Sequence, residues 1–208
     1  MGLLRACADV VLIGAGTLDG SPATRWTADD VNPPTADYYA ELRRRRRVPP
    51  QPTLAVLSGS GKIDPNHPGL AQPTVVLTSQ QGAKNLHGIL AAGVEIIAIG
   101  DGPHPDAADA VRVLRDRGHK LILCEGGPTL LGALVESNLL DELFLTVSPR
   151  LAGRSTNAPR LSLVENVELL PDRLTDARLR SVRRADSHLF LRYEIKRSDF
   201  PTERRDSL

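Results

Sequence analysis

Cysteine and aromatic residues are scarce in this sequence, and charges of opposite sign nearly cancel. The two cysteines, Cys7 and Cys124, lie in apolar runs, which suits buried free thiols of a reducing compartment better than a disulfide framework. Lysine and arginine number 26 against 25 acidic residues, so the net charge of +1 gives no overall electrostatic reason to bind nucleic acid. Aromatic residues make up only 3% of the chain, which also argues against a nucleic-acid partner.

Long hydrophobic runs are missing as well. No apolar stretch approaches the roughly 18 residues that a membrane-spanning helix needs. The N-terminus lacks the charged, apolar and small-residue zones of a secretory signal. The five histidines show no spacing typical of metal ligands, so no metal site is predicted. We therefore expect a cytoplasmic protein with no membrane partner.

What the sequence does contain is the rhythm of an α/β protein. Its 208 residues, 41% hydrophobic and 25% charged, fit one globular domain with a buried core. Short runs rich in Val, Ile and Leu end in glycine, serine or acidic residues, and helical patterns separate several of them. These patterns predict strands at residues 8–13, 53–57, 74–77, 94–99 and 120–124, and helices at 36–47, 106–117 and 128–138.

The last third of the chain has a different pattern, with strands and no good helix between the final pair. Strands are predicted at residues 142–147, 167–170, 177–184 and 189–195, with Asp186 and Ser187 as the last turn. We expect an antiparallel hairpin to close the fold. The predicted domain covers residues 1–197, and residues 198–208 are expected to form a polar tail.

The first candidate site is Gly14-Ala15-Gly16-Thr17, which follows a predicted strand. Glycines at such a turn let a ligand approach the backbone closely. A Rossmann fingerprint would need a helix directly after the glycines. Here Ser21-Pro22-Ala23-Thr24 follows, which is a poor helix. The motif therefore indicates either a glycine loop that contacts a cofactor in another α/β fold or a tight turn without a ligand.

The second candidate site places Gly126 and Gly127 between a strand end and a helix start. The free N–H groups and the positive dipole end of that helix favour a phosphate, and Thr129 adds a hydroxyl donor. Glu125 lies at the carboxyl end of the strand, where ligands bind in open α/β sheets. The alternative is a glycine-capped helix with an exposed carboxylate.

Two further features carry weaker signals. Thr78 and Ser79 end a strand in hydroxyls that suit the ribose or extra phosphate of an adenosine, although both residue types are also common helix caps. The run from Arg43 to Arg47 fits a solvated helix face or a local clamp for a phosphorylated ligand. Nucleic-acid binding through this run is a third alternative.

Several of these motifs resemble the reductase domain of riboflavin biosynthesis, over residues 4–195. The residues that carry the resemblance are Ala8-Asp9 leading into Gly14-Ala15-Gly16-Thr17, Pro49-Pro50-Gln51-Pro52, Thr78-Ser79, Cys124-Glu125-Gly126-Gly127-Pro128-Thr129-Leu130, and Val147-Ser148-Pro149-Arg150-Leu151-Ala152-Gly153. The resemblance implies a dihydrofolate-reductase-like fold, with a mixed sheet flanked by helices and a C-terminal antiparallel hairpin. It also implies a homodimer that uses NADPH to reduce the ribosyl group of a phosphorylated aminouracil to a ribityl chain.

The resemblance also implies roles for individual residues. Glu125 would face the substrate, and Ser79 would lie near the adenosine side of the cofactor. The other cofactor contacts would come from Gly14, Gly16 and Thr17, which line the cofactor, and from Gly126, Gly127, Thr129 and Leu130, which hold its pyrophosphate. Hydride chemistry resides in the nicotinamide, so no catalytic residue is assigned.

This sequence departs from the family pattern in three places. Family members begin with a strand next to the active site, whereas only Met1 to Leu4 precede Arg5 here, so we expect an empty position in the central sheet. After Thr17 the family has two aspartates, a proline and an arginine that reads the substrate phosphate. Here Arg25 is the residue that can take that place. The zinc motif of the deaminase half of bifunctional members is absent, which excludes zinc deamination.

Three hypotheses remain. The first is an NADPH-dependent reductase of this aminouracil or of a related pyrimidine or pterin. The second is a domain that binds NADPH but is catalytically silent because the first strand is missing. The third is a nucleic-acid-binding protein that uses Arg43 to Arg47.

Overall fold

The computed structural model describes residues 1–153, 161–169, 171 and 174–196. The chain divides into two compact units, Met1–Leu130 and Leu131–Leu208, which are described separately below. Among the described residues, no helix combines the length and the apolar character needed to cross a membrane. The predicted polar tail at residues 198–208 lies outside the described part of the chain.

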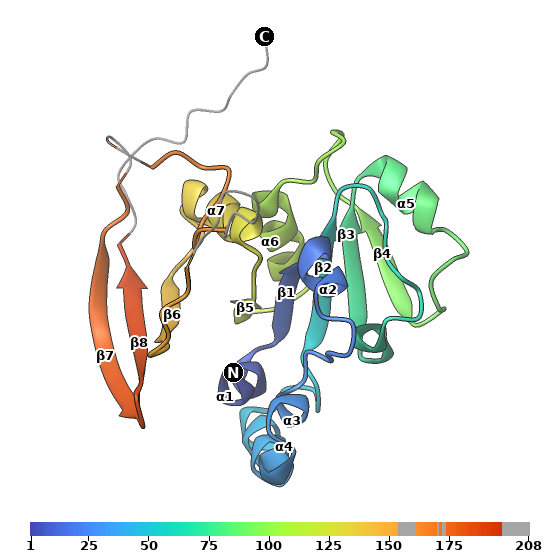
Figure 1. Cartoon of the computed structure of the whole chain (residues 1–208). Helices are drawn as coiled ribbons and strands as arrows, with labels where there is room; N and C mark the ends of the chain where they lie inside the picture. Colours follow the sequence, from blue (N-terminus) through green and yellow to red (C-terminus); the bar gives the residue numbers. More distant parts are fainter. Residues whose placement is uncertain (154–160, 170, 172–173, 197–208) are drawn as a thin grey trace. The chain divides into compact units, whose positions relative to one another are not determined.

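The first unit is built on a five-stranded parallel sheet with the order β4-β3-β2-β1-β5 (Figure 1). Its three inner strands are buried almost throughout, as expected for parallel strands with both faces covered. All five strands lie where the apolar runs predicted them, within one or two residues at each end. Their bounds are β1 Val10–Gly14, β2 Thr53–Ser58, β3 Thr74–Thr78, β4 Val94–Ala98 and β5 Ile122–Cys124.

One face of this sheet carries a hydrophobic cluster of the first unit. Alternate residues of the inner strands, Val11 and Ile13 of β1 among them, pack with Trp26 and with Leu18 and Leu86 from two short helices. Every one of these side chains is at most 2% exposed. The segments that carry Leu18 and Trp26 come directly after β1, so burial of these two residues fixes the path of the chain beyond that strand.

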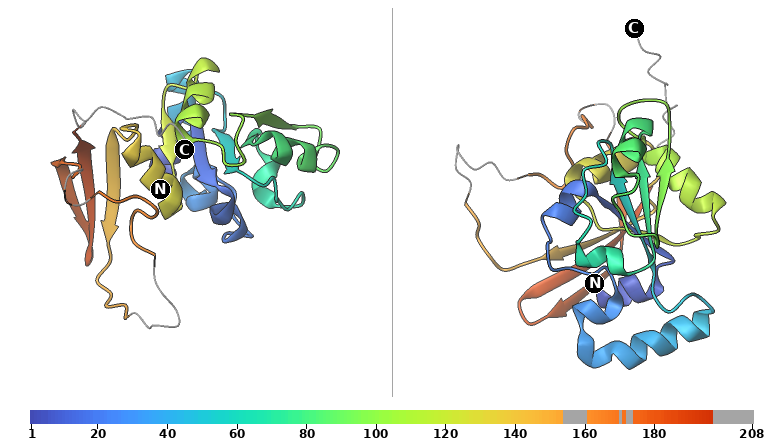
Figure 2. Two further views of the ribbon diagram at one scale, coloured as in Figure 1. Left: turned by 90° about the horizontal axis from the view of Figure 1, so that it is seen from above. Right: turned by 90° about the vertical axis from the view of Figure 1, so that its right-hand side faces the viewer.

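Seven α-helices begin in the first unit. The predicted α4 (Ala36–Arg46), α6 (Ala107–Asp116) and α7 (Pro128–Glu136) are confirmed, and α7 continues into the second unit. Gly118 follows α6 with a φ of +89°, which agrees with its predicted part in ending that helix. Three of the helices, α1, α3 and α4, lie together at one end of the sheet (Figures 1 and 2). The helices that the sequence did not predict are α1 (Gly2–Cys7), α2 (Ala15–Asp19), α3 (Ala28–Val31) and α5 (Gln80–Leu86), with short 3-10 turns η1 (Pro33–Thr35) and η2 (Pro68–Ala71).

The second unit contains a three-stranded antiparallel sheet with the order β6-β8-β7. The predicted closing hairpin is confirmed, with Asp186 and Ser187 at its turn. The predicted strand at residues 167–170 is wrong for 167–169, and Leu170 lies outside the described residues. Val167 packs instead beside Gly132 of α7, so helix packing prevails over local strand propensity. The strand bounds are β6 Glu142–Val147, β7 Ala177–Ala185 and β8 His188–Ile195.

The eight strands of the described residues do not form one continuous mixed sheet. In the first unit β5 pairs with β1 alone, and in the second unit β6 pairs with β8 alone. No described strand occupies the open edge of β5 or the open edge of β6. The described strands therefore form two separate sheets, a parallel one in the first unit and an antiparallel one in the second.

Candidate cofactor and substrate site

The candidate site lies where the order of the parallel strands reverses. The chain passes from β1 outward through β2 and β3 to β4, and then returns to form β5 on the other side of β1. In open α/β sheets, ligands bind outside the carboxyl ends of the strands at such a switch point. Gly14 ends β1, and Glu125, Gly126 and Gly127 follow the end of β5. The two glycine motifs therefore converge on the position that the topology favours for a ligand.

Backbone hydrogen bonds join these two motifs directly. The Gly14 N–H donates to the carbonyl oxygen of Gly126 over 3.0 Å, and the Glu125 N–H donates to the carbonyl of Leu12 over 3.0 Å. A side-chain carbon placed on Gly127 would lie 3.5 Å from Oγ1 of Thr17. Four of the predicted cofactor residues, Gly14, Thr17, Gly126 and Gly127, thus belong to one local structure.

A short helix that the sequence did not predict starts immediately after β1. Helix α2 covers Ala15–Asp19, so Gly16 and Thr17 lie within a helical turn. The Ser21-Pro22 segment lies beyond this helix, as its sequence suggested. At five residues α2 is too short for a periodic signal, and the burial of Leu18 in the core holds it in place.

The glycines of the site differ from most other glycines in what surrounds them. A side-chain carbon added to Gly14, Gly16 or Gly126 would meet no protein atom within 4 Å. At Gly82, by contrast, the added carbon would lie 2.0 Å from Oγ1 of Thr78. Packing within the chain therefore does not require glycine at positions 14 and 16. Gly126 has a φ of +93°, a conformation that glycine adopts readily.

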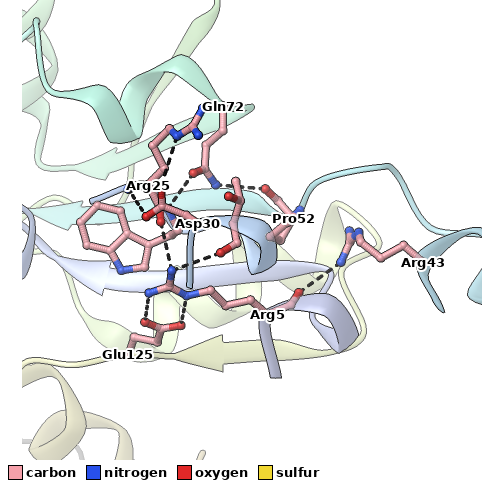
Figure 3. A network of polar contacts seen from close by, with 9 residues as sticks. Arg5, Arg25, Asp30, Arg43, Pro52, Gln72 and Glu125 are labelled. Atoms are coloured by element: carbon pink, nitrogen blue, oxygen red, sulfur yellow. Dashed lines mark hydrogen bonds and ion pairs between the residues drawn. The ribbon is translucent and has the colours of Figure 1, made fainter. Parts of the chain in front are cut away.

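The carboxylate of Glu125 is held by Arg5, a residue that the sequence analysis did not single out. Nε and Nη2 of Arg5 donate to the two oxygens of Glu125, each over 2.7 Å (Figure 3). The side chains are only 7% and 9% exposed. The signal that could have revealed Arg5 is a single arginine in an apolar segment, since a buried charge needs a partner.

Arg5 also binds the loop that follows α2. Its Nη1 donates to the carbonyl oxygens of Arg25 and Thr27, over 3.0 and 3.3 Å. The side chain of Arg25 is 51% exposed, and its Nε lies 3.5 Å from Oδ1 of Asp30. Between Arg25 and Thr27, the backbone N–H of Trp26 donates to Oε1 of Gln72 over 2.9 Å. The two predicted substrate residues, Glu125 and Arg25, are thus linked through one guanidinium group.

Ser79 is a helix cap, which confirms the alternative that the sequence left open for it. Its hydroxyl accepts a hydrogen bond from the Gly82 N–H and donates one to the Gly59 carbonyl, over 2.9 and 2.8 Å. The residue is 1% exposed, so its side chain has no open surface to offer to a ligand. Ser79 instead fixes the loop after β2, whose Ser58-Gly59-Ser60-Gly61-Lys62 sequence is a glycine-rich signal that sequence reasoning missed.

The last two predicted cofactor residues, Thr129 and Leu130, lie in the first turn of α7, directly after the glycine pair. The side chain of Leu130 is buried at 6% exposure. What Leu130 presents to a ligand is therefore its backbone N–H rather than its side chain. The arrangement of strand, glycine pair and helix N-terminus is the one that the sequence predicted.

Burial of Arg43 corrects both the solvated-face and the phosphate-clamp alternatives for that residue, whereas Arg44 to Arg47 are exposed. Arg43 is 2% exposed, and its Nη1 donates to the carbonyls of Arg5, Ala6 and Ala8 at the end of α1. Burial lowers the pKa of its guanidinium from the ordinary value. Arg44 and Arg45 are exposed and both pair with Glu41.

Comparison with known proteins agrees with this arrangement. The family model of the RibD C-terminal domain matches residues 1–189. The chain is 27% identical over 178 residues to the riboflavin biosynthesis protein RibD of Escherichia coli (strain K12), covering 82% of this chain and 44% of that protein. It is 25% identical over 132 residues to RibD of Buchnera aphidicola, covering 63% of this chain and 34% of that protein. The chain thus spans less than half the length of these curated relatives.

Solved structures share the fold. A pyrimidine reductase-like protein from Corynebacterium diphtheriae superposes with a TM-score of 0.73 at 22% identity, over 95% of this chain and 79% of that one. RibD of Acinetobacter baumannii gives a TM-score of 0.68 at 20% identity, over 94% of this chain and 49% of that one. The family indicated by the glycine motifs is confirmed: this chain belongs to the RibD C-terminal domain family.

Proposed function

We propose that this protein is an NADPH-dependent reductase that reduces the ribosyl group of 5-amino-6-(5-phosphoribosylamino)uracil, or of a related pyrimidine or pterin, to a ribityl chain. Membership of the RibD C-terminal domain family supports a reductase of riboflavin biosynthesis. A bifunctional deaminase and 5-amino-6-(5-phosphoribosylamino)uracil reductase from Thermotoga maritima shares the fold with a TM-score of 0.59. The observation that carries the proposal is the open space in front of Gly14, Gly16 and Gly126 at the switch point.

The residues around this space fit a dinucleotide. Two glycines that the chain's own packing does not require leave room for a ligand to lie against the backbone. The N-terminus of α7 follows directly and offers N–H groups and a positive dipole end to a pyrophosphate. The residues that would hold NADPH are Gly14, Gly16, Thr17, Gly126, Gly127, Thr129 and Leu130. When bound, NADPH supplies the hydride that reduces C1′ of the ring-opened sugar.

The chain's own residues would bind and orient the substrate. Glu125 has only acceptor oxygens, and each of them already takes one N–H from Arg5, so its remaining lone pairs suit sugar hydroxyls. The side chain of Arg25 is half exposed and makes one long contact with Asp30, which leaves its guanidinium able to bind a phosphate. We propose that Ser79 acts indirectly, because it fixes the loop after β2 and does not contact the cofactor.

The proposal includes a cytoplasmic homodimer. In the second unit, residues directly opposite one another on antiparallel strands share a face. One face of the β6-β8-β7 sheet is therefore apolar, and several of its side chains are 38 to 52% exposed. This face suits a second copy of the chain, because an open apolar surface of this kind commonly marks an interface. Its apolar residues are Leu143, Leu145, Val147, Leu179, Val182, Leu189, Leu191 and Tyr193, and Arg184 lies opposite Leu189 at the margin of the same face.

A second candidate function is an NADPH-binding domain without catalysis. The observation that favours it is the unpaired edge of β5 in the first unit, because Glu125 directly follows this edge strand. Saturable NADPH binding with no turnover of the aminouracil would select this candidate. The third hypothesis, nucleic-acid binding through Arg43 to Arg47, fails for the buried Arg43 and is left with the exposed Arg44 to Arg47, of which two pair with Glu41.

The proposal is tested by titrating the protein with NADPH and with NADH, with nicotinamide fluorescence as the measure of binding. Gly14→Val fills the open space at the switch point, and we expect it to raise the Kd for NADPH at least about tenfold. Gly93→Val is the matched control, because Gly93 also faces open space and also adjoins a strand, but lies far from the glycine motifs in the sequence. Equal affinity in the wild type and Gly14→Val would reject the cofactor site. Gly126 is a poorer choice for this test, because its positive φ would strain any side chain.

A further inference from the structure

A buried guanidinium group ties together the two segments that carry the proposed substrate residues. An arginine has five N–H donors in a fixed planar fork. Four of the five donors of Arg5 are used: two on the carboxylate of Glu125, one on the carbonyl of Arg25 and one on that of Thr27. Glu125 follows β5, whereas Arg25 and Thr27 belong to the loop after α2. Arg5 itself lies on α1, so these contacts join three separate parts of the first unit.

We propose that Arg5 is a positioning residue, which orients the Glu125 carboxylate and aligns it with the loop that carries Arg25, so that a polyol phosphate can bind both. This inference rests on the proposed function for its substrate. The bidentate pair fixes the plane and the direction of the carboxylate, which a single hydrogen bond would leave free to turn. The bond to the Arg25 carbonyl fixes the backbone from which that side chain extends.

The cofactor half of the site does not depend on Arg5. Gly126 is held by the Gly14 N–H, and Glu125 is held through its own backbone N–H by the carbonyl of Leu12. These backbone contacts keep the glycine loops together whatever the side chain of residue 5 may be. The inference therefore predicts different effects on the two ligands. Replacing the guanidinium group of Arg5 should impair substrate binding and leave NADPH binding nearly intact. A role confined to stability would affect both together.

The variant that tests this is Arg5→Lys. It retains the positive charge, but its compact ammonium group cannot span both carboxylate oxygens and both carbonyls. We expect the KM for the aminouracil to rise at least about tenfold while the Kd for NADPH changes less than about twofold. Glu125→Gln should give a similar change in KM, and the double variant should be little worse than either single one, because the two groups act as a unit. Arg44→Lys, on an exposed ion pair, is the matched control.

A second measurement decides the inference without any activity. Hydrogen exchange followed by mass spectrometry should show faster exchange in Arg5→Lys for peptides covering residues 24–28 and 124–127 together, with the strands β2 and β3 unchanged. Unchanged exchange in these two peptides, or a loss of NADPH binding as large as the loss of substrate binding, would overturn the positioning role. A wild-type chain that shows neither NADPH binding nor turnover would reject the proposed function, and the exchange result would still decide whether Arg5 orders both segments.

Discussion

Arginine side chains in this protein have opposite roles according to their burial. Arg5 and Arg43 are 6% and 2% exposed, and both donate to acceptors of the chain itself, although Nη2 of Arg43 is buried without a partner among the described residues. Arg44 is on the same helix as Arg43, yet it is exposed and forms only a surface pair with Glu41. Buried charges need several hydrogen bonds to offset their desolvation, whereas exposed pairs contribute little to stability. The residue type alone therefore does not separate a structural arginine from a ligand-binding one.

Cys124 gives a prediction at the same scale. It ends β5 beside Glu125, and burial is the main reason that the pKa of its thiol is raised to about 11. A thiol with this pKa is only about 0.1% thiolate at pH 8, and the thiolate is the reactive form. In a Cys7→Ser variant, we expect Cys124 to resist a disulfide reagent at pH 8 in the native protein and to react fully in denaturant. Labelling of the native protein at the rate of a free thiol would contradict this.

The raised pKa of Cys124 also makes the free energy of unfolding depend on pH. The folded state favours the neutral thiol, so the folded pKa of Cys124 lies above the ordinary value of 9.0. Its contribution to the free energy of unfolding is therefore complete below pH 9 and is lost as the pH rises towards 11. A Cys124→Ser variant should lack this part of the alkaline loss of stability.

Among the elements, helix α4 stabilises helix α1 through a single side chain. The last carbonyls of a helix lack helical N–H partners, and Nη1 of Arg43 donates to the carbonyls of Arg5, Ala6 and Ala8, of which that of Arg5 also accepts from the Ala8 N–H. Nε of Arg43 also donates to the carbonyl of Pro49 over 2.7 Å, which fixes the chain beyond α4. Because α1 carries Arg5, this cap supports the candidate site indirectly.

Arg43→Met should therefore destabilise the protein by at least about 2 kcal/mol, because it leaves several buried carbonyls without a donor. Arg44→Met, one position along the same helix, should change the free energy of unfolding by less than about 0.5 kcal/mol. Urea unfolding of the two variants measures this difference directly. Equal stability of both variants would mean that the hydrogen bonds from Arg43 to the end of α1 contribute nothing to the free energy of unfolding.

The elements that sequence patterns predicted are the ones with enough residues to show a period. Helix α6 has its apolar residues on one side, and Asp106 caps its first turn as expected from such a boundary. Helices α1, α2, α3 and α5 have four to seven residues each, and none was predicted. Helices this short are not stable by themselves and form because tertiary packing buries residues such as Leu18 and Leu86.

For the whole molecule, the three-stranded sheet predicts self-association. Val182 is 52% exposed and lies opposite Leu191 on the apolar face. We expect Val182→Lys to shift the protein from twice the mass of one chain to the mass of one chain, measured by sedimentation. Ser181→Lys is the control, because Ser181 is the neighbouring residue of β7 and lies opposite Arg192 on the other face. A wild type that sediments as a single chain would reject the homodimer.

Apart from the wrongly predicted strand at residues 167–170, the sequence by itself determined the strands, the longer helices and the two glycine motifs, because these depend on local composition and on periods of a few residues. It also predicted that the glycine motifs follow strands. Only the tertiary structure decided that the order of strands reverses between β1 and β5, which brings Gly14 to Gly126. Sequence could not reveal this, because strand order depends on contacts between residues far apart in the chain.

The same reason explains the partners of single side chains. Glu125 and Arg5 are 120 residues apart, and no local pattern connects them. Ser79 had two open interpretations in the sequence and burial selected the helix cap, whereas the burial of Arg43 fits none of the interpretations that were open for it. Residue type determines what a side chain can donate or accept, whereas the tertiary fold determines which acceptor it reaches and whether water competes for it.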